Sequence, residues 1–334
     1  WNSKIMSNPK LLTVCIASYN RSATIKKLIQ EIIDFGLNDQ IEILVIDDCS
    51  PDNTFENISK FNNYNNTTVI KNTSNLGRAR TQLKYFNLCK TEYLIELPDD
   101  EMLFKEGLLE LLALLPTIDV DFLSTRWIDT TGLFYDVRGS EKVQEIPLSR
   151  LREQSEHSIG CVFRSSITKL SEEYILKRLD NDCALAFFYH QNIVLCIAKL
   201  NNLNLFSSPI VLGGYRPEGP LDSNFVDSGG NSYRSITVAF NKYIGMRTFY
   251  QDMLMEYGHS PMYGELKALS EFHNLSLYGV IDDAITFSDE RDQERVAMGE
   301  SLRAGSIRNF FNPVKALKYF FTFLSGKFKL WRFK

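Results

Sequence analysis

The sequence has few of the residues that mark flexible linkers and zinc ribbons, and it lacks the long apolar run of a membrane span. Its 334 residues include only 10 prolines, 18 glycines, four histidines and six cysteines. The cysteines form no Cys-x-x-Cys pair and most lie in apolar segments, so we expect buried reduced thiols rather than disulfides or a zinc site. No run reaches the roughly 18 uninterrupted apolar residues of a membrane span. The 44% of hydrophobic residues is enough for a sizeable core, which excludes a disordered chain.

Two glycine-rich nucleotide-binding motifs are also missing. No Gly-x-Gly-x-x-Gly follows the first predicted strand, and no Gly-x-x-x-x-Gly-Lys-Ser/Thr occurs anywhere. These absences disfavour a dinucleotide-dependent dehydrogenase and a P-loop ATPase. If the protein binds a phosphate-bearing ligand, we expect a metal and arginine side chains to neutralise its charge.

Charge is distributed unevenly along the chain. The 37 basic and 41 acidic residues give a net charge of −4, but residues 301–334 carry eight basic residues and no acidic one. The net charge of residues 1–300 is therefore −12. An acidic body argues against nucleic acid as a partner, whereas the basic tail could contact an anionic surface.

Strand and helix patterns alternate over the first 130 residues. Short apolar segments predict strands at residues 11–16, 41–46, 67–70, 93–97 and 120–124. Amphipathic segments between them predict helices that begin near residues 22, 53, 79 and 107. Strands separated by helices predict an α/β fold, in which a parallel or mixed sheet is covered by helices on both faces.

Polar residues follow three of these strands. The segments are Tyr19-Asn20-Arg21, Asp47-Asp48 and Asp99-Asp100-Glu101. In such sheets ligands bind at the carboxyl ends of the strands. If the three strands are neighbours, five carboxylates and Arg21 converge on one edge, which is costly unless a cation or a sugar-phosphate with its metal lies among them. Each segment by itself could equally be an ordinary solvated turn.

Four motifs in series carry a resemblance to a known family. They are VCIASYNR at residues 14–21, ILVIDDCSPDNT at 43–54, NLGRAR at 75–80 and EYLIELPDD at 92–100. In order and spacing they resemble the family 2 glycosyltransferases of GT-A fold. The resemblance implies a Rossmann-like mixed sheet flanked by helices.

The expected organisation starts with a catalytic domain at residues 9–230. It comprises a nucleotide-sugar-binding half (9–130) and an acceptor-side half (131–230). Helical patterns then predict a C-terminal extension over residues 231–300, followed by a basic amphipathic tail at 301–334.

The resemblance also implies roles for residues on the donor side. Ala17, Ser18 and Tyr19 would pass under the nucleobase, and Asp48 would accept a hydrogen bond from it. Arg78 or Arg80 would approach the donor diphosphate. Arg21 is a further donor-side candidate. Arg216 is another, in a turn-rich segment at 213–219 that could close over the donor or could be a plain connector.

The implied divalent metal is Mn or Mg, held by the segment after the fourth strand. Here the sequence reads Pro98-Asp99-Asp100-Glu101 where the family commonly has Asp-x-Asp-Asp, and the register is ambiguous by one residue. Asp100 is a metal ligand in either register, whereas Asp99 and Glu101 are each ligands in only one. Asp99 would also contact the donor ribose. Hard oxygen ligands of this kind suit Mg or Mn.

The acceptor side is expected to supply a catalytic base. The family places a carboxylate just before an apolar helix in this part of the chain, and Asp182 is the best match, with Asp180 as the alternative. This residue would take a proton from an acceptor hydroxyl. Helix capping would use an aspartate here equally well. The implied reaction is an inverting transfer of one sugar from a nucleoside-diphosphate sugar to a hydroxyl of a glycan.

The tail predicts contact with a membrane surface. Apolar residues recur at helical spacing over residues 310–331 among basic residues, which indicates a helix lying on an anionic membrane surface through 310–334. We therefore expect a cytoplasmic protein, peripheral on the inner face of the membrane, which would suit a polyprenyl-diphosphate-linked acceptor of the kind that the family often uses. A helix packed on the catalytic domain or in a dimer is the alternative.

Two other functions are alternatives to glycosyl transfer. A catalytically silent nucleotide-sugar-binding subunit of a glycan assembly complex is disfavoured by the presence of Asp48, Arg78 and Asp100. A sugar-nucleotide pyrophosphorylase is expected to have a glycine-rich basic loop after the first strand, where this chain reads Ala17-Ser18-Tyr19-Asn20.

Overall fold

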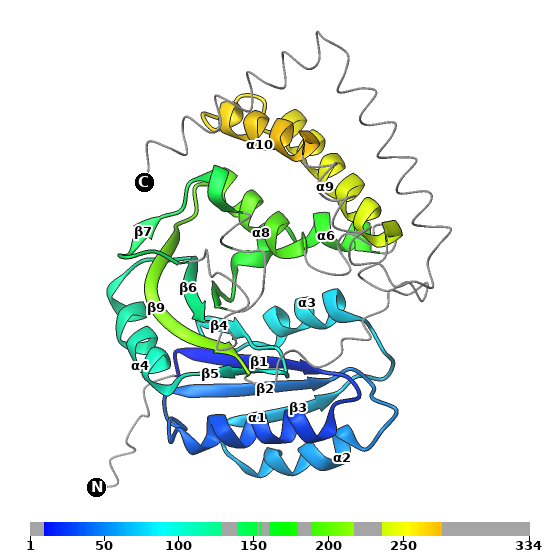
Figure 1. Ribbon diagram of the computed structural model, residues 1–334, viewed down its shortest axis with the longest axis vertical. Coiled ribbons are helices and arrows are strands. Elements are labelled where there is room, and N and C mark those ends of the chain that lie inside the picture. Colours follow the sequence, from blue (N-terminus) through cyan, green and yellow to red (C-terminus); the bar gives the residue numbers. More distant parts are fainter. Residues whose placement is uncertain are drawn as a thin grey trace, which may run out of the picture. The chain divides into compact units, whose positions relative to one another are not determined.

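The chain folds into two compact units. The computed structural model describes residues 10–128, 139–151, 154, 160–179, 189–216 and 236–275. The first unit is Trp1–Asn224 and the second is Phe225–Lys334 (Figure 1). The division lies close to the predicted end of the catalytic domain at residue 230.

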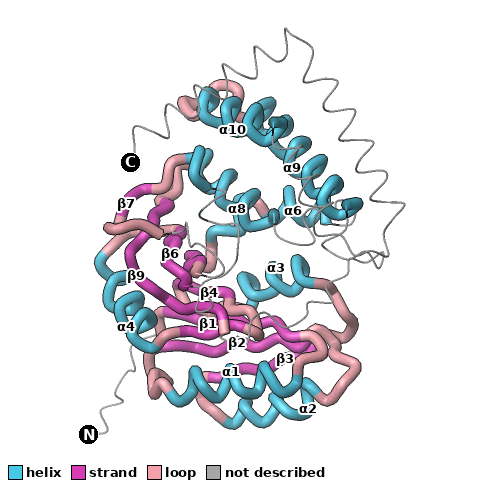
Figure 2. The backbone as a smooth tube through the Cα atoms, viewed as in Figure 1, coloured by secondary structure: helices cyan, strands magenta, loops and turns pink. Residues whose placement is uncertain are grey.

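A mixed sheet of nine strands forms the first unit (Figure 2). Its parallel half contains β1 (Leu12–Ser18), β2 (Ile41–Asp47), β3 (Thr67–Lys71) and β4 (Tyr93–Glu96), in the spatial order β3-β2-β1-β4. β1 and β2 are apolar and buried along almost their whole length, the pattern of strands that are covered on both faces. β1 lies between β2 and β4. The three strands with polar ends are thus neighbours, which is the condition for their polar residues to converge on one edge.

The other half of the sheet is mixed. β8 (Cys161–Arg164) runs antiparallel to both β4 and β6 (Phe122–Ile128), and β6 runs parallel to β9 (Leu205–Tyr215). The short strands β5 (Glu101–Leu103) and β7 (Gln144–Glu145) both pair antiparallel with β9. The order is thus β3-β2-β1-β4-β8-β6-β9-β5, with β7 also on β9.

Helices cover both faces of the parallel half. α1 (Ser22–Asp34) and α2 (Thr54–Ile58) lie on one face and α3 (Arg78–Leu88) on the other (Figure 1). The apolar positions predicted for the first helix are all buried in α1: Ile25, Leu28, Ile29, Ile32 and Ile33. The other helices of this unit are α4 (Lys105–Leu114), α6 (Glu172–Leu179), α8 (Tyr189–Leu200) and the 3-10 turns Ser59–Asn63, Leu115–Thr117, Leu148–Arg150 and Ile167–Leu170. The prediction of an α/β fold with a mixed sheet is confirmed.

The prediction of a turn-rich loop at residues 213–219 is wrong for its first part. Gly213, Gly214 and Tyr215 lie in β9 rather than in a turn. A Cβ atom on Gly213 would lie 2.2 Å from the carbonyl oxygen of Met102 and 2.4 Å from the ring of Trp127. The glycine is needed here because neighbouring groups approach the backbone closely, and not because the chain turns.

The described cysteines are free thiols, of which three are buried and two, Cys49 and Cys89, are half-buried. They are Cys15, Cys49, Cys89, Cys161 and Cys196, and Cys183 lies outside the described residues. Burial raises the pKa of the Cys196 thiol to about 12, and burial also raises the pKa of Cys15. Both side chains are therefore neutral and pack as small apolar residues.

The second unit is helical where it is described. It contains α9 (Ile236–Glu256) and α10 (Tyr263–Leu275), whose ring contacts include the stack of Tyr243 on His273 at 4.8 Å. The apolar stripe of α9 is buried at Tyr243, Met246, Phe249 and Met253. Among the described helices, none combines the length and the hydropathy needed to cross a membrane. The predicted tail at 301–334 lies outside the described residues.

Candidate active site

Three polar segments leave the sheet side by side. In the register of β1 and β2, Ser18 lies opposite Asp47, and on the other side of β1, Cys15 lies opposite Glu96. The pairing continues past β4, because the Leu97 N–H donates to the Cys15 carbonyl at 2.8 Å. The segments that follow β1, β2 and β4 therefore start from one edge of the sheet.

Asp99 and Asp100 form an acidic pair with Arg21 at this edge. Arg21 Nη1 lies 2.9 Å from Asp100 Oδ2 and 3.4 Å from Asp99 Oδ1. Ser18 Oγ donates a hydrogen bond of 2.8 Å to the other oxygen of Asp99, Oδ2. Burial raises the pKa of Asp99 to about 6, an effect that the Arg21 guanidinium opposes and the Asp100 charge reinforces. The structure thus brings together four of the predicted site residues.

The turn that carries Arg21 is fixed by hydroxyl groups from the segment after β2. Asn20 has a φ of +58°, in the left-handed region that asparagine tolerates. Its N–H donates to Ser50 Oγ at 2.9 Å, and the N–H of Arg21 donates to Thr54 Oγ1 at 3.2 Å. The backbone of this turn is therefore fixed by residues that follow β2 and not by β1 alone. Tyr19, next to this turn, is 47% exposed.

Asp48 organises the loop before α3. Its Oδ1 accepts hydrogen bonds from Asn72 Nδ2 at 2.7 Å and the Leu76 N–H at 2.9 Å, and its Oδ2 accepts the Gly77 N–H at 2.9 Å. Gly77 has a φ of +76°, which favours glycine. Both oxygens of Asp48 are thus occupied by this chain, and they position the residue that starts α3, Arg78. The neighbouring Asp47 is fully buried and accepts the Ser50 N–H at 3.2 Å.

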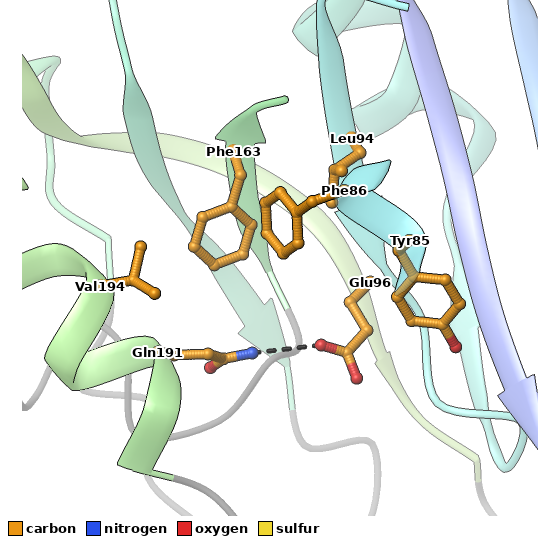
Figure 3. Close-up of a pocket in the computed structure, with 7 residues that line it drawn as sticks. All are labelled: Tyr85, Phe86, Leu94, Glu96, Phe163, Gln191 and Val194. Atoms are coloured by element: carbon orange, nitrogen blue, oxygen red, sulfur yellow. Dashed lines mark hydrogen bonds between the residues drawn. The ribbon is translucent and has the colours of Figure 1, made fainter. Parts of the chain in front are cut away.

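Glu96 is a buried charged residue that the motif analysis does not single out. Its carboxylate lies 3.7 Å from Arg78 Nη2 and accepts hydrogen bonds from Gln82 of α3 and from Gln191 of α8, the latter at 3.2 Å (Figure 3). Burial raises the pKa of Glu96. The sequence indicates such a residue by placing a single charge in an apolar strand, because a buried charge requires hydrogen-bonding or ionic partners.

A small cavity adjoins this carboxylate. Its volume is about 10 Å³, room for about one water molecule, and its lining is mostly apolar: Tyr85, Phe86, Leu94, Phe163 and Val194, with Glu96 and Gln191 (Figure 3). It is too small for a sugar.

The remaining predicted residues lie elsewhere or outside the described chain. Arg216 forms two hydrogen bonds with Glu31 of α1, at 3.2 and 2.6 Å, and thus contacts a helix rather than the acidic pair. Glu101 begins β5 opposite Tyr215 and is 6% exposed. Ala17 lies half-buried in β1, and Arg80 lies half-buried in α3. Asp180 and Asp182 fall outside the described residues.

The acidic pair fits a metal that is shared with a phosphate ligand. No group of three or more His, Cys, Asp or Glu side chains in the described part of the chain could enclose a metal by itself. Mg²⁺, however, is usually bound by one or two carboxylates that leave its other positions to phosphate and water. Asp100 meets this requirement, since among the described residues it makes contact only through Oδ2 and leaves Oδ1 available.

Comparison with known protein families decides the identity of the first unit. Residues 13–178 match the family described as Glycosyl transferase family 2. These residues belong to that family. The chain is a glycosyltransferase, and its mixed sheet is the GT-A fold that the four motifs predict. The match ends at residue 178, two residues before Asp180.

Solved structures support the fold of this glycosyltransferase. S. aureus TarS 1–349 in complex with UDP-GlcNAc is similar with a TM-score of 0.61 and 16% identity, over 86% of this chain and 79% of that one. S. aureus TarS 1–349 in complex with UDP gives a TM-score of 0.58 and 17% identity, over 90% and 89% of the two chains. No curated protein matches the sequence.

Replacing Glu96 by glutamine should change how stability depends on pH. Because the pKa of Glu96 is raised above 4.5 in the folded protein, the folded state holds this proton more tightly than the unfolded chain does. The resulting stability is present below pH 4.5 and is lost as the pH rises through the folded pKa. Glu96→Gln removes this loss, so its free energy of unfolding should improve relative to wild type between pH 4.5 and neutrality, as measured by urea denaturation.

The control is Thr117→Ala, which removes an exposed hydroxyl group and no titratable group. Because no ionisable side chain changes, its difference from wild type should stay nearly constant over the same pH range. A constant difference for Glu96→Gln as well would contradict the prediction.

Proposed function

We propose that this glycosyltransferase moves one sugar from a nucleoside-diphosphate sugar to a hydroxyl group of a glycan acceptor, with inversion and with a divalent metal. The observation that carries the proposal is the cluster of Ser18, Arg21, Asp99 and Asp100 at the joined ends of β1 and β4. The nucleotide-sugar class is supported by the TarS structures, which are complexes with UDP-GlcNAc and with UDP.

In this proposal the acidic pair would hold the metal. Asp100 would be its main ligand and Asp99 the second, since Glu101 belongs to β5 and is nearly covered there. A bound Mn or Mg ion would supply positive charge that neutralises the leaving diphosphate. Ser18 positions Asp99 through its hydrogen bond.

The chain's own cations would complete diphosphate binding. Arg78 begins α3, and the Asp48 carboxylate fixes the turn from which this helix starts. The Glu96 carboxylate, 3.7 Å away, limits the orientations of its guanidinium. Arg78 is therefore the better placed of the two predicted arginines, and Arg80 follows in the first turn of α3. Ala17 and Tyr19 would contact the nucleobase.

The acceptor side rests on the family resemblance. Asp182, or Asp180 in the alternative register, would take the proton of the acceptor hydroxyl as its oxygen attacks the anomeric carbon. The acceptor we propose is a lipid-linked glycan, and the basic tail would hold the protein on the membrane surface that carries it.

Removal of the metal ligand tests the donor site. Asp100→Ala should abolish the Mn²⁺-dependent increase in melting temperature that UDP-, GDP-, dTDP- or CDP-sugars produce, because the metal loses its main protein ligand. It should leave the fold intact, since the residue lies at a strand end. Asp121→Ala, far from this edge in the contacts of Arg164, is the control. Full Mn²⁺-dependent turnover in Asp100→Ala would show that the metal site is misplaced, and a wild type that never hydrolyses a nucleotide sugar would favour a binding subunit.

Replacement of the base should separate turnover from donor binding. Asp182→Asn should lower the rate of transfer on the order of 10²- to 10⁴-fold with nearly unchanged donor affinity, because the group acts on the acceptor proton. Steady-state kinetics with a glycan acceptor measure both quantities. If Asp180→Asn shows this profile instead, the alternative register is correct.

The membrane proposal predicts a loss of vesicle binding in a truncated chain. Ending the chain after Glu300 removes eight basic residues, each contributing about 1 kcal/mol near an anionic surface. The shortened protein should no longer sediment with anionic liposomes but should still hydrolyse donor. Equal sedimentation of the two chains, or binding that does not respond to salt, would contradict the proposal.

A further inference from the structure

The metal and Arg21 would bind the same pair of carboxylates, Asp99 and Asp100. We propose that the Arg21 guanidinium is the built-in counter-ion of Asp99 and Asp100 in the donor-free protein, and that it moves onto the donor diphosphate when the divalent metal takes its place. This inference rests on the proposed function, because it concerns how the acidic pair accepts its metal.

The geometry shows a shared position. A single nitrogen, Arg21 Nη1, contacts both carboxylates, at 2.9 Å from Asp100 Oδ2 and 3.4 Å from Asp99 Oδ1. The Arg21 side chain is only 14% exposed, and those of Asp99 and Asp100 are 11% and 17% exposed. Water screens this pair weakly at such burial, so the guanidinium is strongly held until something replaces its charge.

The charges favour replacement of Arg21 by the metal only when a diphosphate is present to receive the guanidinium. Two carboxylates and one guanidinium leave a net charge of −1, which still attracts a divalent cation. A metal on Asp100 would lie next to the guanidinium, and the two cations would repel each other. An arriving diphosphate removes this conflict, because it offers oxygens that a guanidinium binds in a bidentate way.

The anchoring of neighbouring groups allows the side chain to move alone. The backbone N–H of Arg21 is fixed on Thr54, and that of Asn20 is fixed on Ser50. On the other side, Ser18 holds Asp99 through Oδ2, the oxygen that Arg21 does not contact. Rotation of the Arg21 side chain would therefore withdraw Nη1 from the acidic pair while the Arg21 backbone stays bonded to Thr54 and Asp99 stays bonded to Ser18.

Manganese binding to the full chain tests the exchange. Electron paramagnetic resonance would measure Mn²⁺ affinity for wild type and Arg21→Gln, without nucleotide and in separate titrations with UDP and GDP. Without nucleotide, Arg21→Gln should bind Mn²⁺ on the order of tenfold more tightly, because no guanidinium has to leave. With the nucleoside diphosphate that binds, this advantage should disappear or reverse, because in wild type Arg21 then contacts the diphosphate.

Two variants complete the design. Arg164→Gln removes another arginine paired with carboxylates, at the opposite end of β4, and should leave Mn²⁺ affinity unchanged in both states. Arg21→Lys keeps the charge and should bind free Mn²⁺ as weakly as wild type, which gives a second reading if Arg21→Gln fails to fold.

Three results would overturn the inference. Equal Mn²⁺ affinity of wild type and Arg21→Gln without nucleotide would show that Arg21 does not compete with the metal. An equal gain in affinity with and without nucleotide would show that Arg21 acts only as a fixed charge. A wild type that binds no Mn²⁺ even with nucleotide would refute the metal in the proposed function as well, and so differs from the first two results, which refute the exchange alone.

Discussion

Parallel pairing of β1 with β2 on one side and β4 on the other is the constraint on which the site depends. The register sets Ser18 beside Asp47 and brings the segment after β4 next to the end of β1. A shift of one residue would turn every side chain of β1 to the opposite face and would move Ser18 away from its partner Asp99. The hydrogen bond from Ser18 to Asp99 and the ion pairs of Arg21 exist only in this register.

Buried polar groups around this edge form two separate systems. One contains Ser18, Arg21, Asp99 and Asp100, and the other is centred on Glu96, with partners from α3 and α8. Each carboxylate in them is paired, as the cost of burying a bare charge requires. The Glu96 system also joins the parallel half of the sheet to α8, the helix that follows the segment with the proposed catalytic base. Through Glu96, β4 thus contacts both α3 and α8, and its end leads into the segment that carries Asp99 and Asp100.

The sequence predicts the local parts of this structure well and the long-range parts poorly. Apolar periodicity is a property of neighbouring residues, so it identifies β1, β2 and the buried face of α1. The ion pair of Arg216 with Glu31 joins residues 185 positions apart, which no local pattern reveals. Gly213 and Gly214 indicate a turn by composition, yet they lie in β9, where Met102 and Trp127 leave no room for a side chain on Gly213. The convergence of Arg21 with the acidic pair was predictable only on the condition that the strands are neighbours.

The short segment between β4 and β5 has a mechanical consequence. Three strands separate β4 from β5 in the order of the sheet, so in a flat sheet they would lie roughly 19 Å apart. Only residues 97–100 connect them, a stretch of about 17 Å at full extension, and the Glu101 N–H bonded to the Pro98 carbonyl makes it shorter still. The sheet must therefore curl until β5 returns towards the centre. Asp99 and Asp100 lie in the short segment that maintains this curvature. The length of this segment is therefore as constrained as the chemistry of its two carboxylates.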